Sequence, residues 1–276
     1  MYNEQKKDRK PHNRPRPAAA KQGTGAYHAE TPNEGAVSGR NAVRELLSGG
    51  RDIDKIFVAR GDRSGSIVSL VAEAIERRIP IVEVDRKRLD SMCGHNRHQG
   101  IVAMAAEAAY SSLDDIFARA AEMGEPPLIV IADEIEDPHN LGALIRCAEC
   151  AGAHGLIVPK RRAVGLTSVV SKASAGAIEH LPIVKVTNLA STIDELKEKG
   201  LWLYAADMDG SPYYETDWKG SAAIVLGSEG FGISRLVKEK CDFVVSIPIY
   251  GKVNSMNVST AAAVILCEAA KQRRAK

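Results

Sequence analysis

Residues 128–133 (LIVIAD) and 223–227 (AIVLG) decide the fold of this 276-residue chain. Both are short, nearly continuous apolar runs, without the alternation of apolar and polar residues that a half-exposed strand shows. Strands of this kind are buried on both faces, which happens when helices cover both sides of a parallel sheet. Four similar runs occur at 155–159 (GLIVP), 182–186 (PIVKV), 201–206 (LWLYAA) and 243–248 (FVVSIP). The pattern predicts an α/β domain with a parallel sheet over residues 128–276.

Helices are expected between these runs, at residues 140–151, 189–199, 234–240 and 257–271. The last has the clearest apolar stripe, made by Val258, Ala262, Ile265, Leu266 and Ala269. Lys and Arg side chains at the C-terminal end of this predicted helix also favour it, because they offset the negative end of the helix dipole.

A smaller α/β domain is expected at residues 37–106, with helices at 39–47, 67–77 and 86–93 and strands at 54–60, 81–84 and 100–106. Residues 107–127 are the predicted linker, because Pro126 and Pro127 cannot continue a helix. Residues 1–34 lack periodicity and have few large apolar side chains, so we predict that this arm is disordered.

The predicted arm is basic. Residues 1–25 hold seven Lys and Arg against two acidic residues, a net charge of +5, whereas the whole chain carries +2 and the remainder therefore −3. A basic arm on a slightly acidic body is typical of proteins that bind a polyanion, because phosphates attract Lys and Arg. A solvated tail that only aids solubility has the same composition, and charge alone does not separate the two.

Composition excludes several classes of protein. The chain is 45% hydrophobic and 26% charged, which is ordinary for a soluble globular protein. Its longest apolar runs, 128–132 and 261–267, fall short of the roughly 20 residues that span a bilayer, and its basic N-terminus lacks the apolar core of a secretory signal. Five cysteines predict reduced thiols in the cytoplasm. Cys147 and Cys150 form a CxxC without a second ligand pair, so no metal site is expected.

Three loops can carry chemistry, because ligands of parallel α/β sheets bind beyond the carboxyl ends of the strands. Residues 133–142 (DEIEDPHNLG) include Asn140, a good helix N-cap, and precede Arg146, which is either a clamp for an anion or a surface charge. Residues 227–232 (GSEGFG) allow a close approach of the backbone to a ligand, but they lack the GxGxxG spacing of a nicotinamide dehydrogenase. Residues 247–259 (IPIYGKVNSMNVS) hold more polar side chains than a helix cap needs.

Together these segments resemble a known family. DPHNLGALIRCAECAGAHGLIVP, IVLGSEGFGISRLV and VVSIPIYGKVNSMNVSTAAAVILCEA are similar to the three signature motifs of the SpoU/TrmH (SPOUT) RNA ribose 2′-O-methyltransferases, in the family's order and near its spacing. SGRNAVRELL and DKIFVARG resemble the family's small substrate-binding domain. The DPHNLG form brings the chain closest to the RlmB-type 23S ribosomal RNA guanosine-2′-O-methyltransferases. The resemblance covers residues 37–276.

The resemblance implies a trefoil-knotted parallel-sheet methyltransferase domain, a topology that is rare among proteins. It implies a homodimeric, cytoplasmic enzyme that binds S-adenosyl-L-methionine and RNA, but no metal, DNA or membrane. The expected reaction is methyl transfer to a ribose 2′-hydroxyl, with a guanosine of 23S ribosomal RNA as the first substrate. A transfer RNA substrate and a non-catalytic RNA-binding or ribosome-assembly role are the alternatives. A non-catalytic relative is expected to lose some of the family's polar motif residues. This chain keeps all five of them, Asn140, Arg146, Glu229, Ser255 and Asn257.

The matching motif positions also imply which residues form the site. The catalytic set is Asn140, Arg146, Glu229, Ser255 and Asn257, and the cofactor-binding set is Leu226, Gly227, Gly230, Ile247 and Met256. Met256 replaces the commoner Leu of its motif, a volume-conserving change. The family points to Arg146 as the residue that acts on the hydroxyl, either as base or as electrostatic clamp. His95 and His98, in the loop CGHNRHQG, are an RNA-facing pair, a metal pair or plain solvated residues.

Deletion of residues 1–34 tests the basic arm. If the arm binds RNA phosphates, the truncated protein will bind RNA more weakly, and its plot of log affinity against log salt will flatten by about 0.7 for each phosphate that the arm neutralises. The measurement is a salt titration of RNA binding by both forms. An unchanged slope would show that the arm does not contact the RNA.

Overall fold

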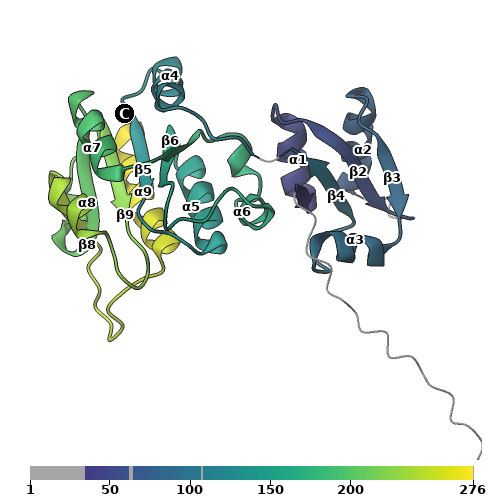
Figure 1. Ribbon diagram of the computed structural model, residues 1–276. Helices are drawn as coiled ribbons and strands as arrows, with labels where there is room; N and C mark the ends of the chain where they lie inside the picture. The colour runs from purple at the N-terminus through teal and green to yellow at the C-terminus, as the bar shows by residue number, and fades with distance from the viewer. Residues whose placement is uncertain (1–34, 62–64, 107, 276) are drawn as a thin grey trace, which may run out of the picture.

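The computed structural model describes residues 35–61, 65–106 and 108–275, so the predicted disorder of residues 1–34 lies outside it. These residues form two sheets, each with its own hydrophobic core (Figure 1). The first sheet has the strand order β1-β4-β2-β3, and the second has the order β10-β8-β9-β5-β6-β7. Because the second sheet carries the three loops that can bear chemistry, it is the sheet that positions the site.

The small N-terminal sheet is mixed. Strands β2 and β3 are parallel, whereas β4 runs antiparallel to both β1 and β2. Strand β1 was not expected, because three residues are too few to show a periodic pattern. The elements are β1 (Ala36–Ser38), α1 (Arg40–Ser48), β2 (Ile53–Ala59), α2 (Ser66–Glu76), β3 (Ile81–Val84), α3 (Arg86–Cys93) and β4 (Ile101–Ala105).

The second sheet confirms the predicted parallel α/β architecture. All six apolar runs are strands, and every neighbouring pair is parallel. Strand β8 continues six residues past the predicted end at residue 206, because Ser211 and Pro212 pair with β10 beyond a register shift. The strands are β5 (Leu128–Ala132), β6 (Gly155–Pro159), β7 (Ile183–Val186), β8 (Trp202–Pro212), β9 (Ala222–Leu226) and β10 (Phe243–Ser246).

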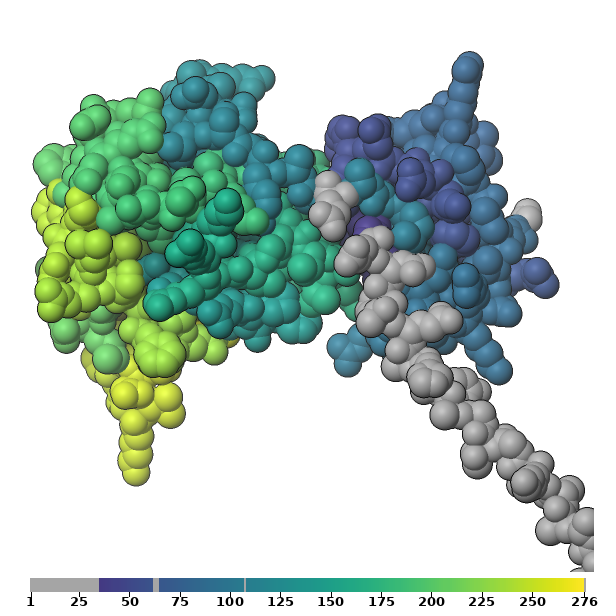
Figure 2. Space-filling view, in the orientation of Figure 1, coloured from purple at the N-terminus to yellow at the C-terminus, as the bar shows by residue number. Residues whose placement is uncertain are grey.

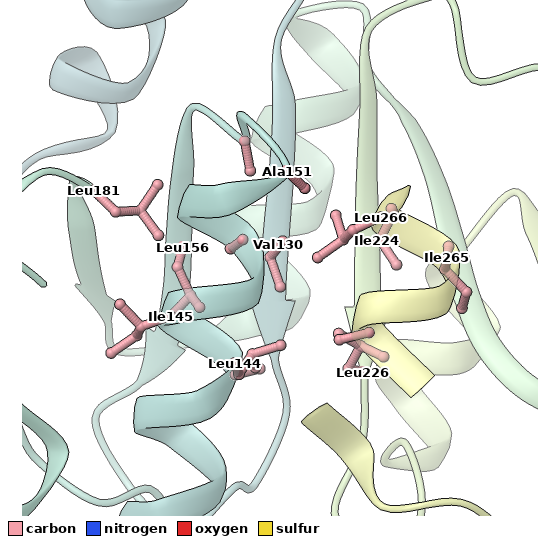
Figure 3. Close-up of a cluster of buried hydrophobic side chains, with 14 of the residues drawn as sticks. Val130, Leu144, Ile145, Ala151, Leu156, Leu181, Ile224, Leu226, Ile265 and Leu266 are labelled. Atoms are coloured by element: carbon pink, nitrogen blue, oxygen red, sulfur yellow. The ribbon is translucent and has the colours of Figure 1, made fainter. Parts of the chain in front are cut away.

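Helices cover both faces of this sheet. On one face α5 (Pro138–Cys150) and α9 (Val258–Arg274) pack together, and Figure 3 shows Leu144 of α5 and Leu266 of α9 against Val130 and Ile224 of the sheet. The other face buries a second apolar cluster. The further helices are α4 (Leu113–Met123), α6 (Ser168–Ala173), α7 (Leu189–Glu198), α8 (Arg235–Lys240) and the 3-10 turns η1 (Ala177–Glu179) and η2 (Tyr213–Glu215). None of the described helices has the length and apolar content that a membrane crossing requires.

Helix α5 begins earlier than expected, so Asn140 is not its N-cap. Asp137 caps the helix, and its carboxylate accepts hydrogen bonds from the backbone N–H groups of His139 (2.6 Å) and Asn140 (3.2 Å). Pro138 occupies the first turn, where its fixed φ suits a helix start. The side chain of Asn140 is therefore left for another contact.

The two sheets are joined through α6 and η1, which contact β1 and α1. Helix α6 lies on the side of the second sheet that faces α1 (Figure 1), and the two parts touch in the space-filling view (Figure 2). The Arg51 guanidinium pairs with Glu179 at 3.2 Å, and His180 Nε2 lies 2.8 Å from a Glu45 carboxylate oxygen. Lys172 Nζ lies 2.6 Å from His95 Nε2. Burial and the Lys172 ammonium lower the pKa of His95, so its ring is neutral at pH 7 and accepts a hydrogen bond.

Gly142→Ala tests the packing of α5 on α6. A Cβ at this position would lie 2.4 Å from Ala173 Cβ and 2.8 Å from the Val170 carbonyl oxygen, so the helices would have to separate. We expect a loss of about 1–3 kcal/mol in the free energy of unfolding, measured in urea. Gly220→Ala is the control, because a Cβ there meets nothing within 4 Å. Equal stability of the two variants would contradict the packing argument.

Candidate functional site

The loops after β5 and β9 are tied together at the carboxyl edge of the sheet. Asp133, 3% exposed, directly follows β5, and its backbone N–H donates to the Leu226 carbonyl oxygen at 2.8 Å. Its carboxylate accepts a hydrogen bond of 2.7 Å from the backbone N–H of Ser234. The 227–234 loop is therefore anchored at both of its ends to the same residue.

Within that loop the backbone folds tightly on itself. Ser228 and Gly232 exchange backbone hydrogen bonds of 3.1 and 2.9 Å, and Gly232 has a φ of +68°. A Cβ on Gly227 would lie 2.0 Å from the Gly232 carbonyl carbon. Only glycine fits at position 227, because any Cβ there would collide with the backbone of the same loop.

A first cavity of about 420 Å³ lies beside this loop. Its lining includes all five residues of the expected cofactor-binding set, Leu226, Gly227, Gly230, Ile247 and Met256. Glu229 and Ser255 of the expected catalytic set line it too. Sequence reasoning missed the contribution of Asp207 and Met208, which belong to the part of β8 beyond its predicted end.

Asp207 is a charged group on this cavity. Its carboxylate lies 2.7 Å from Lys238 Nζ. Burial raises the pKa of Asp207, but hydrogen bonds from Lys238 and from the Met208 N–H outweigh burial and leave the pKa below its usual value. The carboxylate is therefore ionised at neutral pH and can accept hydrogen bonds from hydroxyl or amino groups of a ligand.

Three of the expected catalytic residues meet in one hydrogen-bonded cluster. Asn257 Nδ2 donates to Asn140 Oδ1 at 2.8 Å and also to a Glu229 carboxylate oxygen. Asn257 Oδ1 caps α9, where it accepts from the N–H groups of Ser259 (3.0 Å) and Thr260 (3.3 Å). Because Asn257 is fixed at the start of α9, its amide group holds the side chains of Asn140 and Glu229 in place.

A second cavity of about 620 Å³ lies on the other side of the loop. Residues 228–231 and Val258 line both cavities, so Glu229 borders a ligand in either one. The second cavity also meets Asn140 and four carboxylates, with Arg162 as its only cation among the described lining residues. Two adjoining cavities with one shared polar wall suit a transfer between two bound molecules.

Arg162 was not anticipated. It ends the run Lys160-Arg161-Arg162 that directly follows β6, at the same edge of the sheet as the other loops. Three cations in a row after a buried parallel strand are the signal that could have drawn attention to this loop.

Two of the expected catalytic residues stand apart from the cluster. Arg146 is exposed on α5, about 9 Å along the helix axis from Asn140, and lines neither cavity. Its guanidinium interacts with the thiol of Cys150, whose pKa burial and Glu149 nevertheless raise. Ser255 lines the first cavity and makes no hydrogen bond to the described members of the cluster.

His95 and His98 lie away from these cavities. His98 is 2% exposed, and its ring nitrogens lie 2.9 Å from the Gly100 backbone N and 3.2 Å from an Asp90 carboxylate oxygen, so it supports a turn and is not the solvated or RNA-facing residue considered above. His95 contacts Lys172 between the sheets. Over residues 35–61, 65–106 and 108–275, no three His, Cys, Asp or Glu side chains are placed to hold a metal ion, and all five cysteines are free.

Comparison with known proteins matches both parts of the chain to family models. The SpoU rRNA Methylase family model matches residues 127–267, and the model for RNA 2′-O ribose methyltransferase substrate binding matches residues 36–111. A Bacillus subtilis (strain 168) protein, YacO, proposed to be a TrmH family tRNA/rRNA methyltransferase, is 46% identical over 238 residues, which cover 86% of this chain and 95% of YacO. A similarly named protein of Staphylococcus haemolyticus is 43% identical over 242 residues, with 86% and 95% covered.

Solved structures resemble the fold over most of its length. The SpoU methyltransferase AviRb from Streptomyces viridochromogenes, crystallised with AdoMet, superimposes with a TM-score of 0.73 at 27% identity, covering 87% of this chain and 90% of AviRb. A crystal structure of an RNA 2′-O ribose methyltransferase gives a TM-score of 0.73 at 25% identity, covering 86% of this chain and 88% of that one.

Asn257→Ala tests the cluster as a structural unit. The change removes the α9 cap and both hydrogen bonds donated by Nδ2, so we expect the free energy of unfolding to fall by about 1 kcal/mol in a urea titration. Asn254→Ala is the control, since Asn254 is exposed and makes no hydrogen bond with a described residue. If the two variants unfolded at the same urea concentration, Asn257 would not hold the loops together.

Proposed function

The chain belongs to the SpoU rRNA Methylase family, and we propose that it methylates the ribose 2′-hydroxyl of a guanosine in 23S ribosomal RNA. It is an RNA 2′-O-ribose methyltransferase whose cofactor is S-adenosyl-L-methionine. The choice of ribosomal RNA rests on the DPHNLG form of the first motif. The relatives are named for transfer and ribosomal RNA alike, so transfer RNA is the alternative substrate.

We propose that S-adenosyl-L-methionine occupies the first cavity. The residues there fit this molecule: Ile247 and Met256 offer apolar surface, and the Asp207 carboxylate can accept from the ribose or amino group. The cofactor supplies a methyl group on a positively charged sulfonium. Glu229 at the shared wall adds a negative charge near that group.

The second cavity is the proposed place of the target nucleoside. The observation that carries the proposal is the Asn140–Asn257–Glu229 cluster at the wall between the cavities. A ribose hydroxyl there faces the cofactor side of the wall, and holding two reactants in line removes much of the entropic cost of their reaction. Glu229 keeps acceptor capacity beyond its bond from Asn257 and can take the hydroxyl proton directly or through water.

Arg146 is proposed to stabilise the developing alkoxide and clamp the neighbouring phosphate. A guanidinium stays protonated in proteins and is a poor base, whereas a preorganised cation is well suited to developing negative charge. Because Arg146 is exposed and lines neither cavity of its own chain, we propose that it acts in a homodimer. Phe231 and Tyr250, each 93% exposed, provide apolar surface on the loops around the first cavity for such pairing. The trefoil knot implied by the family is part of the same proposal.

Single-turnover methylation of ribosomal RNA fragments tests these roles. We expect the wild type to methylate a guanosine 2′-oxygen, and Arg146→Ala to lower the rate about 10²–10³-fold, since a preorganised charge at the reacting oxygen is removed. Arg146→Lys keeps the charge but not the planar fork and should fall between them, and Glu229→Gln should lose about 10²-fold. Calorimetry with the cofactor should show unchanged binding in the two Arg146 variants, because Arg146 does not line the first cavity.

Arg235→Ala is the control for charge, because the Arg235 side chain is 90% exposed and pairs with Glu239 one turn along the same helix. If Arg146→Ala methylated RNA at the rate of the parent protein, Arg146 would have no catalytic role. Methylation of transfer RNA but not ribosomal RNA by the wild type would replace the proposed substrate with the alternative.

A further inference from the structure

Arg162 lies at the rim of the second cavity, on the loop after β6. One guanidinium nitrogen, Nη1, lies 2.8 Å from a Glu134 carboxylate oxygen on the neighbouring loop after β5. A backbone hydrogen bond of 3.2 Å from the Val164 N–H to the Ile135 carbonyl oxygen ties the same two loops. The Arg162 side chain is 72% exposed, so its other N–H donors reach solvent and the cavity.

Both partners of this ion pair have a strained backbone. Glu134 has a φ of +55° and Arg162 a φ of +53°, the left-handed region that residues with a side chain rarely adopt. An exposed ion pair adds little stability and does not by itself account for two strained positions. Strain of this kind is concentrated where a protein binds ligands or performs chemistry, because the geometry gained there is functional.

The charge of the cavity calls for such a cation. Glu134, Glu136, Asp137 and Glu229 line it, and Arg162 is the only cation among the described lining residues. An RNA strand that places a ribose at the polar cluster also brings the phosphates on either side of that ribose into this acidic surrounding. Without a counter-charge, the carboxylates would repel those phosphates.

We propose that Arg162 binds an RNA phosphate next to the target nucleotide and thereby holds the target ribose at the second cavity. The inference rests on the proposed function in that the ligand is the RNA substrate, but it does not depend on which RNA is methylated. A planar guanidinium with free donors suits a phosphate, which accepts two parallel hydrogen bonds. Glu134 occupies Nη1 and leaves the remaining donors for the ligand.

Steady-state methylation with Arg162→Ala, Arg162→Lys and Arg235→Ala tests this role, using whichever RNA, ribosomal or transfer, the full-length wild type methylates. For Arg162→Ala we expect the KM for RNA to rise about tenfold at low salt with kcat within twofold of the parent, because the variant lacks one ion pair with a phosphate that forms before the chemical step. The slope of log affinity against log salt should fall by about 0.7. Arg162→Lys should recover the slope and part of the KM, and Arg235→Ala should match the parent.

Cofactor affinity by calorimetry and the thermal midpoint should be unchanged in Arg162→Ala, which separates RNA binding from misfolding. A parental KM and salt slope in Arg162→Ala would overturn the proposal and reduce Arg162 to a surface ion pair. An equal KM rise in Arg235→Ala would overturn it as well, since the effect would then be one of overall charge. Methylation of transfer RNA alone would refute only the ribosomal substrate, because the Arg162 comparison is made on that RNA.

Discussion

The buried carboxylate of Asp133 is the contact on which the site depends. A carboxylate in this position is costly unless it is hydrogen-bonded, and here it accepts the Ser234 N–H at the far end of the glycine loop. The backbone of the same residue holds Leu226 at the near end of that loop. Because β5 and β9 are adjacent and parallel, their carboxyl ends meet, and one aspartate can fix both ends of the segment between the two cavities. The close approach at Gly227 and the position of Glu229 both follow from this anchor.

The charges of the two cavities can be compared with the ligands proposed for them. The first cavity carries the carboxyl groups of Asp207 and Glu229, which suit a ligand with a sulfonium and an amino group. The second cavity is also acidic, although RNA is a polyanion, so favourable charge for the RNA has to come from elsewhere. Arg162 at the rim is one proposed source, and the small domain and the basic arm outside the described residues are others. Acidic cavities can hold the reacting groups while separate cations bind the RNA phosphates, because the reacting ribose hydroxyl and the phosphates are different groups of the substrate.

Much of the fold was predictable because parallel strands buried on both faces leave an unambiguous apolar signal. The family resemblance implied the cofactor set, and its members Gly227 and Ile247 directly follow such strands, so the edge of the sheet brings them to one cavity. Short elements with few residues to show a pattern were missed, among them β1 and α6. The end of β8 was also missed, because its pairing with β10 resumes only after a register shift. Polar residues of β8 therefore reached the cavity without any sign in the sequence.

Roles of single side chains were less predictable, because they depend on which of several equivalent partners is nearer in space. Asn140 and Asp137 are both good helix caps, and the structure gives the cap to Asp137 because α5 begins at Pro138. That shift frees Asn140 for Asn257, a contact between residues 117 positions apart that no local pattern specifies. For Arg146 the motif and the structure differ. Its motif position implies a role at the hydroxyl, but the rise of α5 places its exposed side chain outside both cavities. The motif thus implies a role for Arg146, whereas the geometry of one chain leaves it outside both cavities, and the proposed homodimer is the arrangement that reconciles the two.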